Sequence, residues 1–200
     1  ALAAALLLAI LITAMATGAG AATASVTALP AANGQDTGWQ LYGGTGQAWQ
    51  RLGEGQCSPS DSSYASTSSQ GARRSVQLSL ADVPTGATIV RVDVHVCYSD
   101  GNASDGDERI APYIRINGVF TDGPEFTFGG STTPTAATPE QFDLSVVNGP
   151  TTTIEVGVQS NGSGAAVRVY ALWAVVSYEE TPTPTATPTP TPTATPTPTP

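Results

Sequence analysis

The chain has 200 residues and a formal net charge of −9, because its sixteen acidic residues outnumber its seven arginines and it has no lysine. Nucleic-acid binding normally begins with a basic surface, so this charge disfavours nucleic acid as a partner. Glycine, serine, threonine, alanine and valine dominate, and strong helix formers are few after the first segment. Once the two low-complexity ends are set aside, the composition predicts one β-rich domain of about 140 residues.

Residues 1–24 have the pattern of a secretory signal. An apolar run from Leu2 to Ile12 is followed by small residues ending in Ala22-Thr23-Ala24, which predicts cleavage after Ala24. The run is shorter than the ~20 residues that a membrane anchor needs. A basic segment precedes the apolar run in such signals, so we expect the precursor to begin upstream. The mature protein is predicted to be extracellular or at the cell surface, with no membrane span.

The segment between this signal and the first aromatic residues has no periodic pattern. Residues 25–38 are rich in alanine, glycine and proline, and we expect them to form a flexible lead-in. The folded domain is predicted to cover residues 39–180. Residues 39–42 and 48–52 flank the turn Gly43-Gly-Thr-Gly46, which predicts a β-hairpin.

The strongest pattern lies in residues 87–98, where valine occupies every second position from Val90 to Val96. Successive side chains of a strand point to opposite faces, so this pattern predicts a β-strand with one apolar and one polar face. The core face is predicted to carry Val90, Val92, Val94, Val96 and Tyr98, and the other face Arg91, Asp93, His95 and Cys97.

Several other segments show the same alternation. Further strands are predicted at 75–80, 109–117, 119–121, 125–128, 141–146 and 153–158. Asn117-Gly118 is a strong signal for a two-residue hairpin, and the run 165–178 is apolar on both faces, as in a central strand. Together these segments predict an all-β antiparallel sandwich, a jelly roll, with an immunoglobulin-like sandwich as the alternative.

Residues 181–200 contain only threonine, proline and alanine. Such a segment is predicted to be an extended linker or stalk of the polyproline type. The export signal, the β-sandwich and the Thr/Pro spacer together resemble the modular secreted or cell-surface proteins of bacteria. Residues 39–180 are similar in general terms to jelly-roll modules, and this resemblance transfers no binding residue to a position in this chain.

Cys57 and Cys97 are the two cysteines of the chain. Cysteines of an exported domain are usually paired, so a Cys57–Cys97 disulfide is predicted, with two buried free thiols as the alternative. The bond would hold residues 53–69 across the polar face of the valine strand.

Asp93 and His95 are the one acid and base pair that the pattern places on a common face. Residues two apart on a strand lie about 7 Å from each other, and no nucleophile motif such as Gly-x-Ser-x-Gly is present. No enzymatic activity is therefore predicted. A secreted hydrolase with two facing carboxylates is a remote alternative, and no acid pair marks it.

An acidic loop follows the valine strand at residues 100–108. Carboxylate and amide oxygens are the ligands that Ca²⁺ prefers, and the jelly-roll modules that this chain resembles often hold a structural calcium. A solvated acidic loop is the alternative, since the spacing departs from that of an EF-hand. The candidate calcium ligands are Asp100, Asn102, Asp105, Asp107 and Glu108. No other cofactor is expected.

Aromatic residues near the start of the domain suggest a carbohydrate site, because sugar rings stack on exposed aromatic faces. Burial in the core is the competing explanation. We therefore expect a non-catalytic extracellular module with a structural or adhesive role, and as the alternative a carbohydrate-binding module whose partners are polysaccharides or cell-surface components. The candidate stacking residues are Trp39, Tyr42, Trp49, Tyr64 and Tyr113.

Overall fold

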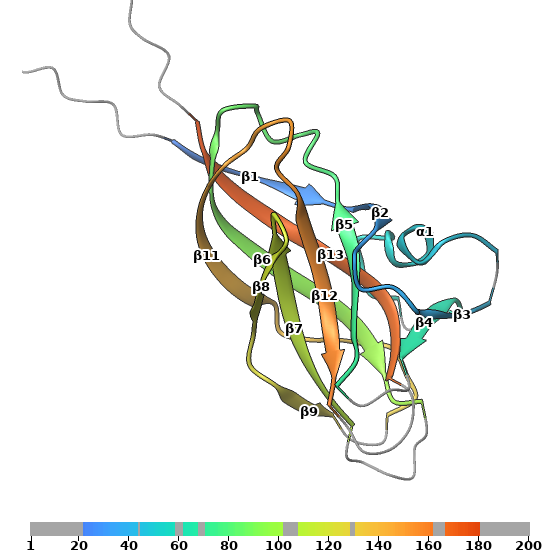
Figure 1. Cartoon of the computed structure of the whole chain (residues 1–200). Helices are drawn as coiled ribbons and strands as arrows, with labels where there is room; N and C mark the ends of the chain where they lie inside the picture. Colours follow the sequence, from blue (N-terminus) through green and yellow to red (C-terminus); the bar gives the residue numbers. More distant parts are fainter. Residues whose placement is uncertain are drawn as a thin grey trace, which may run out of the picture. The chain divides into compact units, whose positions relative to one another are not determined.

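The protein forms two antiparallel β-sheets that pack face to face (Figure 1). This computed structural model describes residues 22–43, 45–58, 62–67, 71–101, 108–128, 131–161 and 167–180. The predicted signal up to residue 21 and the Thr/Pro segment 181–200 lie outside these residues. Within them, no helix has the length and the apolar character that a membrane crossing requires.

The larger sheet has seven strands. Its order is β10 (Thr135–Ala136), β6 (Thr88–Ser99), β13 (Val167–Glu179), β4 (Tyr64–Thr67) and β3 (Gln40–Tyr42), while β1 (Thr23–Ala28) pairs with β13 and β11 (Glu140–Val147) pairs with β6. As predicted from its two apolar faces, β13 is central, with β6 on one side and both β1 and β4 on the other.

The smaller sheet has six strands, and the long strands of the chain alternate between the two sheets. Its order is β2 (Pro30–Asn33), β5 (Arg73–Leu78), β12 (Ile154–Ser160), β7 (Glu108–Ile116) and β8 (Val119–Asp122), with β9 (Phe126–Phe128) also paired to β7. The predicted all-β sandwich is confirmed, and the choice between jelly roll and immunoglobulin-like topology stays a prediction.

The core lies between the sheets, where the apolar faces of β6 and β13 meet those of β5 and β12. Val92, Val94 and Val96 of β6 are at most 1% exposed, which confirms the alternation there. Val90 was expected to be buried as well and is only half-buried, whereas Ile89 is fully buried. The register with β13 shifts at this point, and the extra residue of such a β-bulge reverses which side chain faces the core.

Residues 25–38 are not the flexible lead-in that their composition suggested. Most of β1 and all of β2 lie in this segment, and each completes a different sheet by pairing with β13 and β5 respectively. The compact unit accordingly begins at Ala22 rather than at Trp39. The backbone hydrogen bonds that β13 and β5 offer at their free edges stabilise these strands despite their small side chains.

The hairpin predicted for residues 39–52 is also wrong. β3 pairs with β4, and residues 48–52 form the short helix α1 (Ala48–Leu52). Ala48 and Leu52 bury one face of this single turn, and the backbone N–H of Gln47 donates to Gln50 Oε1 at 2.7 Å at its start. A five-residue helix is too short to show a helical period in the sequence.

The hairpin predicted at Asn117-Gly118 is confirmed. Both residues have positive φ, 48° and 89°, and Ile116 of β7 pairs with Val119 of β8. Positive φ at both central positions is what a tight two-residue hairpin turn requires, and asparagine and glycine adopt it most readily.

Candidate binding pockets on the two faces of strand β3

Residues 34–39, which we call the strap, cross the outer face of the six-stranded sheet and are fastened to Ser75 of β5. The backbone carbonyl of Ser75 accepts a hydrogen bond from the N–H of Gly34 at 3.2 Å. The backbone N–H of Ser75 donates to the carbonyl of Asp36 at 3.0 Å. Its hydroxyl accepts from the N–H of Asp36 at 3.2 Å. One residue therefore fixes the path of the strap.

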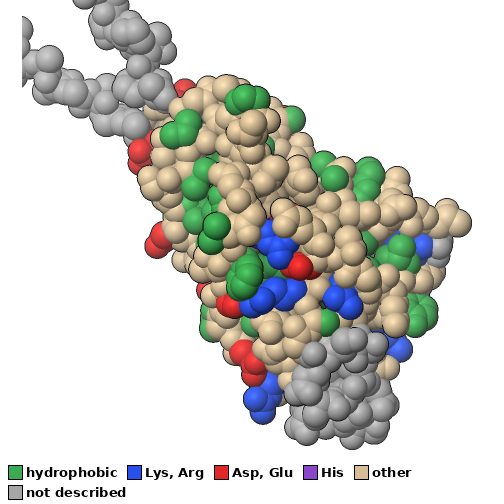
Figure 2. All heavy atoms as spheres, in the orientation of Figure 1, with side chains coloured by type: hydrophobic (Ala, Val, Ile, Leu, Met, Phe, Trp, Pro, Cys, Tyr) green, Lys and Arg blue, Asp and Glu red, His purple; other side chains and the backbone are tan. Residues whose placement is uncertain are grey.

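A buried polar network beneath the strap strengthens this attachment. Arg115 of β7 pairs with Asp36 of the strap and with Glu155 of β12, at 3.2 Å in the second case. Tyr113 donates its hydroxyl to Asp36 at 2.6 Å, and Glu155 accepts from the N–H of Gln35 at 2.9 Å. Figure 2 shows arginine side chains gathered over this face with acidic groups among them. The strap is thus held by charge as well as by backbone bonds.

Tyr113 and two glycines show how closely this network is packed. The Tyr113 ring lies directly on Gly157 of β12, where a Cβ atom would overlap it, and a Cβ on Gly34 would overlap the Ser75 hydroxyl. Burial and the bond to Asp36 raise the pKa of the Tyr113 hydroxyl. Tyr113 therefore serves as a neutral hydrogen-bond donor inside the network.

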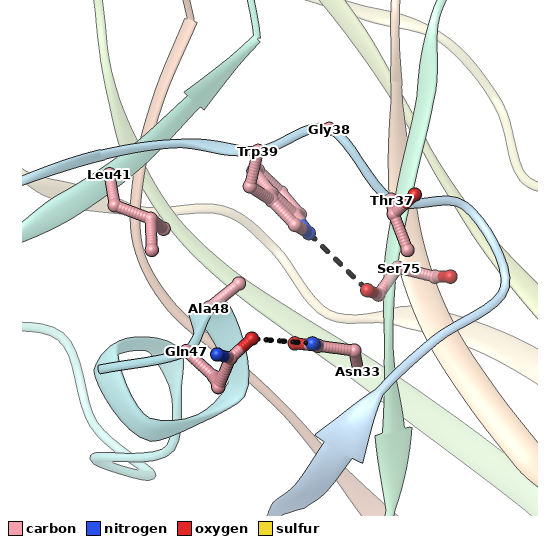
Figure 3. Close-up of a pocket in the computed structure, with 8 residues that line it drawn as sticks. All are labelled: Asn33, Thr37, Gly38, Trp39, Leu41, Gln47, Ala48 and Ser75. Atoms are coloured by element: carbon pink, nitrogen blue, oxygen red, sulfur yellow. Dashed lines mark hydrogen bonds between the residues drawn. The ribbon is translucent and has the colours of Figure 1, made fainter.

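The strap carries Trp39 into a pocket of 160 Å³ between itself and α1 (Figure 3). The indole Nε1–H donates to the carbonyl of Ser75 at 3.3 Å, which fixes the ring, and Figure 3 shows the ring pointing from the strap toward Ser75. Across the pocket, Asn33 Nδ2 donates to Gln47 Oε1 at 2.8 Å. The lining is completed by Thr37, Gly38, Leu41, Ala48 and Ser75.

The chemistry of this Trp39 pocket is neutral and mixed. The indole offers an apolar ring face, while the amides of Asn33 and Gln47 have donors and acceptors beyond their mutual bond. Apolar walls with a few oriented polar groups are typical of small-molecule sites, although this pocket is smaller than the ~300–1,000 Å³ of sites for drug-sized ligands. The geometry suits a single small ring with hydroxyl groups.

A second pocket, here called the tyrosine pocket, lies on the other face of β3, because Leu41 and Tyr42 point to opposite faces of that strand. It has a volume of 180 Å³ and is lined by Tyr42, Tyr64, Ser66, Gly101 and Arg168. The rings of Tyr42 and Tyr64 stack with centroids 4.8 Å apart and planes inclined by 19°. The guanidinium of Arg168 lies 4.9 Å from the centroid of the Tyr64 ring.

The predicted disulfide between Cys57 and Cys97 is confirmed, with their Cα atoms 5.1 Å apart. It holds the segment around Cys57 against the outer face of the seven-stranded sheet, where Tyr64 and the buried Tyr170 pack beside it. Tyr170 also lies 5.4 Å from the Tyr64 ring and bonds through its hydroxyl to Ser99 at 3.1 Å. The disulfide therefore supports the base of the tyrosine pocket.

The five aromatic residues proposed for stacking lie in different surroundings. Trp39 lines its own pocket, and Tyr42 and Tyr64 line the tyrosine pocket. Trp49 is half-buried and packs against the core. Tyr113 is 0% exposed, so its ring is closed to a ligand. Three of the five candidates therefore lie in two separate pockets.

The sequence did not mark Asn33, Gln47, Ser66 or Arg168 as site residues. Asn33, Gln47 and Ser66 are isolated polar residues without a motif. Arg168 did leave a signal, because it is the one charged residue in a run that is otherwise apolar on both faces. A charge in such a run indicates a place where the sheet face meets solvent or a ligand.

The proposed calcium ligands are only partly within the described residues. Asp100 is fully buried at the end of β6. Asn102, Asp105 and Asp107 fall outside the described part of the chain, as does the side chain of Glu108. Among the side chains that the structure describes, no three His, Cys, Asp or Glu residues are grouped to hold a metal ion. The calcium site stays a prediction.

Asp93 and His95 are engaged with different partners. Asp93 accepts two hydrogen bonds from the guanidinium of Arg91, at 2.6 and 3.0 Å. His95 stacks on Trp173 of β13 with ring centroids 4.9 Å apart and planes inclined by 15°. Burial lowers the pKa of His95, and the nearby Asp93 opposes this effect. The arrangement stabilises the outer face of the sheet.

This pKa shift predicts how stability depends on pH. The unfolded chain binds a proton at His95 more readily than the folded chain, so the free energy of unfolding should fall as pH drops below the unfolded value of about 6.5. Because His95 is the only histidine, a His95→Gln variant should show a flatter profile between pH 7.5 and 5 in urea denaturation. Parallel profiles for the two proteins would contradict the assignment.

Two further hollows lie along the side of the sandwich where β7, β8 and β9 approach β10 and β11. They have volumes of 380 and 300 Å³ and share Pro124 and Glu140. Burial raises the pKa of Glu140. Two of the acids nearby form ion pairs, Asp122 with Arg73 at 2.7 Å and Glu125 with Arg109 at 3.2 Å. The hydrolase alternative stays a prediction.

Comparison with known proteins gives limited similarity. No protein-family model and no curated protein matches the chain. Among solved structures, an exo-beta-1,3-galactanase from Phanerochaete chrysosporium in complex with galactose aligns over 79% of this chain and 30% of its own, at 15% identity and a TM-score of 0.34. A family two carbohydrate esterase from Cellvibrio japonicus aligns over 80% of this chain and 34% of its own, at 12% identity and a TM-score of 0.26. This chain thus spans about a third of the length of each enzyme, and alignments at these scores carry no argument about function.

Proposed function

We propose that this protein is a non-catalytic extracellular module with an adhesive role, which binds a neutral saccharide in the Trp39 pocket. The observation that supports this most directly is the half-buried Trp39 ring, fixed by its bond to Ser75 and facing the amide pair of Asn33 and Gln47. An indole offers an apolar surface for the C–H face of a sugar ring, and amides exchange hydrogen bonds with its hydroxyl groups.

The rigidity of the pocket favours binding. The strap is anchored to Ser75, Glu155 and Arg115, so Trp39 is held in place before a ligand arrives. A pre-organised site loses less conformational entropy on binding, which raises affinity. The pocket accommodates one ring, so we expect recognition of a chain end or of a single residue along a polysaccharide.

A purely structural module is the alternative. The packing of Trp39 and Trp49 against the core and the burial of Tyr113 in the polar network favour it, because all three aromatics contribute to packing. In that case the Trp39 ring would serve only to seal the strap against α1.

A glycan array probed with the full chain and two variants separates these functions. Trp39→Leu should lower apparent affinity by at least about tenfold, because it removes the ring face while keeping apolar bulk. Trp49→Phe is the matched control, since it changes a tryptophan outside the pocket and should leave binding unchanged. Urea denaturation of both variants would confirm folding. Absence of any saccharide signal, or equal signals from both variants, would favour the structural alternative.

A further inference from the structure

Arg168 carries a positive charge that no carboxylate among the described residues balances. Ion pairs engage Arg73, Arg91, Arg109 and Arg115. Arg168 instead donates from Nη2 to the carbonyl of Gly101 at 3.0 Å and lies over the Tyr64 ring. These two contacts orient the guanidinium and use one of its five N–H donors. In a protein of net charge −9, an oriented arginine that forms no ion pair with the described acids points to an anionic ligand.

Ser66 gives a second, independent indication. It lies on β4 opposite Arg168 of β13 and lines the tyrosine pocket. The residue is 1% exposed, and its hydroxyl makes no hydrogen bond within the part of the chain that the structure describes. A buried hydroxyl without a partner costs free energy, so a polar group in the pocket would be favoured there.

Tyr42 supplies an apolar wall. One face of its ring stacks on Tyr64, and the residue is 46% exposed. The tyrosine pocket thus combines an oriented guanidinium, a hydroxyl that lacks a partner and an accessible aromatic ring. These three features match a carboxylate, a ring hydroxyl and the apolar face of one acidic sugar.

We propose that the tyrosine pocket binds the carboxylate of a uronic acid through Arg168. The planar guanidinium matches a carboxylate in shape and charge. The net charge of −9 repels a long polyanion, which favours a single uronic acid residue at a chain end or branch over a polyuronate. This site lies on the opposite face of β3 from the Trp39 pocket and is independent of the saccharide proposed there.

Isothermal titration of the full chain with three small probes tests this inference. Methyl β-D-glucuronide carries both the ring and the carboxylate, methyl β-D-glucoside only the ring, and sodium acetate only the carboxylate. We expect the glucuronide to bind at least about tenfold more tightly than the other two, because hydrogen bonds to charged groups are the stronger kind. Equal binding of the glucuronide with either other probe, or no binding of the glucuronide, would overturn the proposal.

Matched variants locate the effect. Arg168→Gln should abolish the preference for the glucuronide, whereas Arg91→Gln makes the same charge change on the same sheet face and should preserve it. Arg91 is paired with Asp93. Ser99 of β6 is the residue opposite Arg168, and Arg91 lies eight positions before Ser99 on the same strand. Arg91 is therefore ~26 Å from Ser99 along β6. An equal loss in both variants would overturn the assignment to Arg168. Trp49→Phe, which changes a residue outside both pockets, should leave glucuronide binding unchanged. The two proposals rest on different pockets and different probes, so this inference and the proposed function fail separately.

Discussion

Replacing Arg115 with leucine is expected to lower the free energy of unfolding by about 3–5 kcal/mol, since it leaves Glu155 and Asp36 without their cation. The side chains of Arg115 and Glu155 are 8% and 5% exposed, so water cannot replace the lost interaction there. Asp36 is 25% exposed and contributes less, because solvent screens it. The loss would be a large part of the ~5–15 kcal/mol that stabilises a typical domain.

The matched control for this prediction is Arg91→Leu. Arg91 is paired as well, with the single acid Asp93, but its side chain is 38% exposed. Solvent-exposed ion pairs of this kind contribute about 0–1 kcal/mol to the free energy of unfolding. Urea denaturation of both variants gives the comparison. The double variant Arg115→Leu/Glu155→Gln should lose less free energy of unfolding than the sum of the losses in the two single variants. The reason is that a neutral amide then replaces the buried carboxylate that Arg115→Leu leaves unpaired. Similar losses for Arg115→Leu and Arg91→Leu would contradict the assignment of the network as the anchor of the strap.

Removal of the disulfide through the Cys57→Ala and Cys97→Ala double variant is expected to have an effect of similar size. The two cysteines are 40 residues apart, and closing a loop of that length stabilises a protein by about 4 kcal/mol in the chain-entropy model. Cys97 is fully buried beside Tyr170, so the loss of packing adds to this value.

The wild-type protein supplies its own control for the disulfide. Reductant should lower the urea midpoint of the wild type to nearly that of the double variant and should leave the double variant unchanged. Thiol titration of the denatured protein without reductant should count no free thiol. Two free thiols, or a wild-type midpoint insensitive to reductant, would show that the bond does not form in solution.

Elements with a strong local pattern were predictable from the sequence. The alternation of β6 follows from valines at every second position, and the Asn117-Gly118 turn follows from the backbone that these two residues adopt readily. The reversal at Val90 was not predictable, because the bulge depends on the register with β13 rather than on residues next to Val90.

Elements that depend on partners far away in the chain could not be predicted from the sequence. β1 and β2 have small side chains and little pattern, and the edges of β13 and β5 determine that they form. The polar network joins Asp36, Arg115 and Glu155 from three segments far apart in the chain. No local motif marks such a network, because its members come together only in the folded sheet.

The candidate sites were predictable in part. Trp39, Tyr42 and Tyr64 were proposed from their residue type, since aromatic rings are suited to sugar contact. Their division between two pockets depends on which face of β3 each residue occupies. The polar groups that complete the pockets, above all Ser66 and Arg168, become candidates only in the folded structure. There, among the described residues, the Ser66 hydroxyl has no hydrogen-bond partner and Arg168 forms no ion pair.

The most direct test of the proposed saccharide site is nuclear magnetic resonance of the indole N–H groups. The chain has three tryptophans, and a Trp39→Phe variant assigns the signal of Trp39. The full chain would be titrated with neutral gluco-, xylo-, manno- and galacto-oligosaccharides. The proposed function predicts that at least one of them shifts the Trp39 signal in a saturable way while the Trp173 signal stays in place. No shift with any oligosaccharide, or shifts confined to the other two tryptophans, would contradict it.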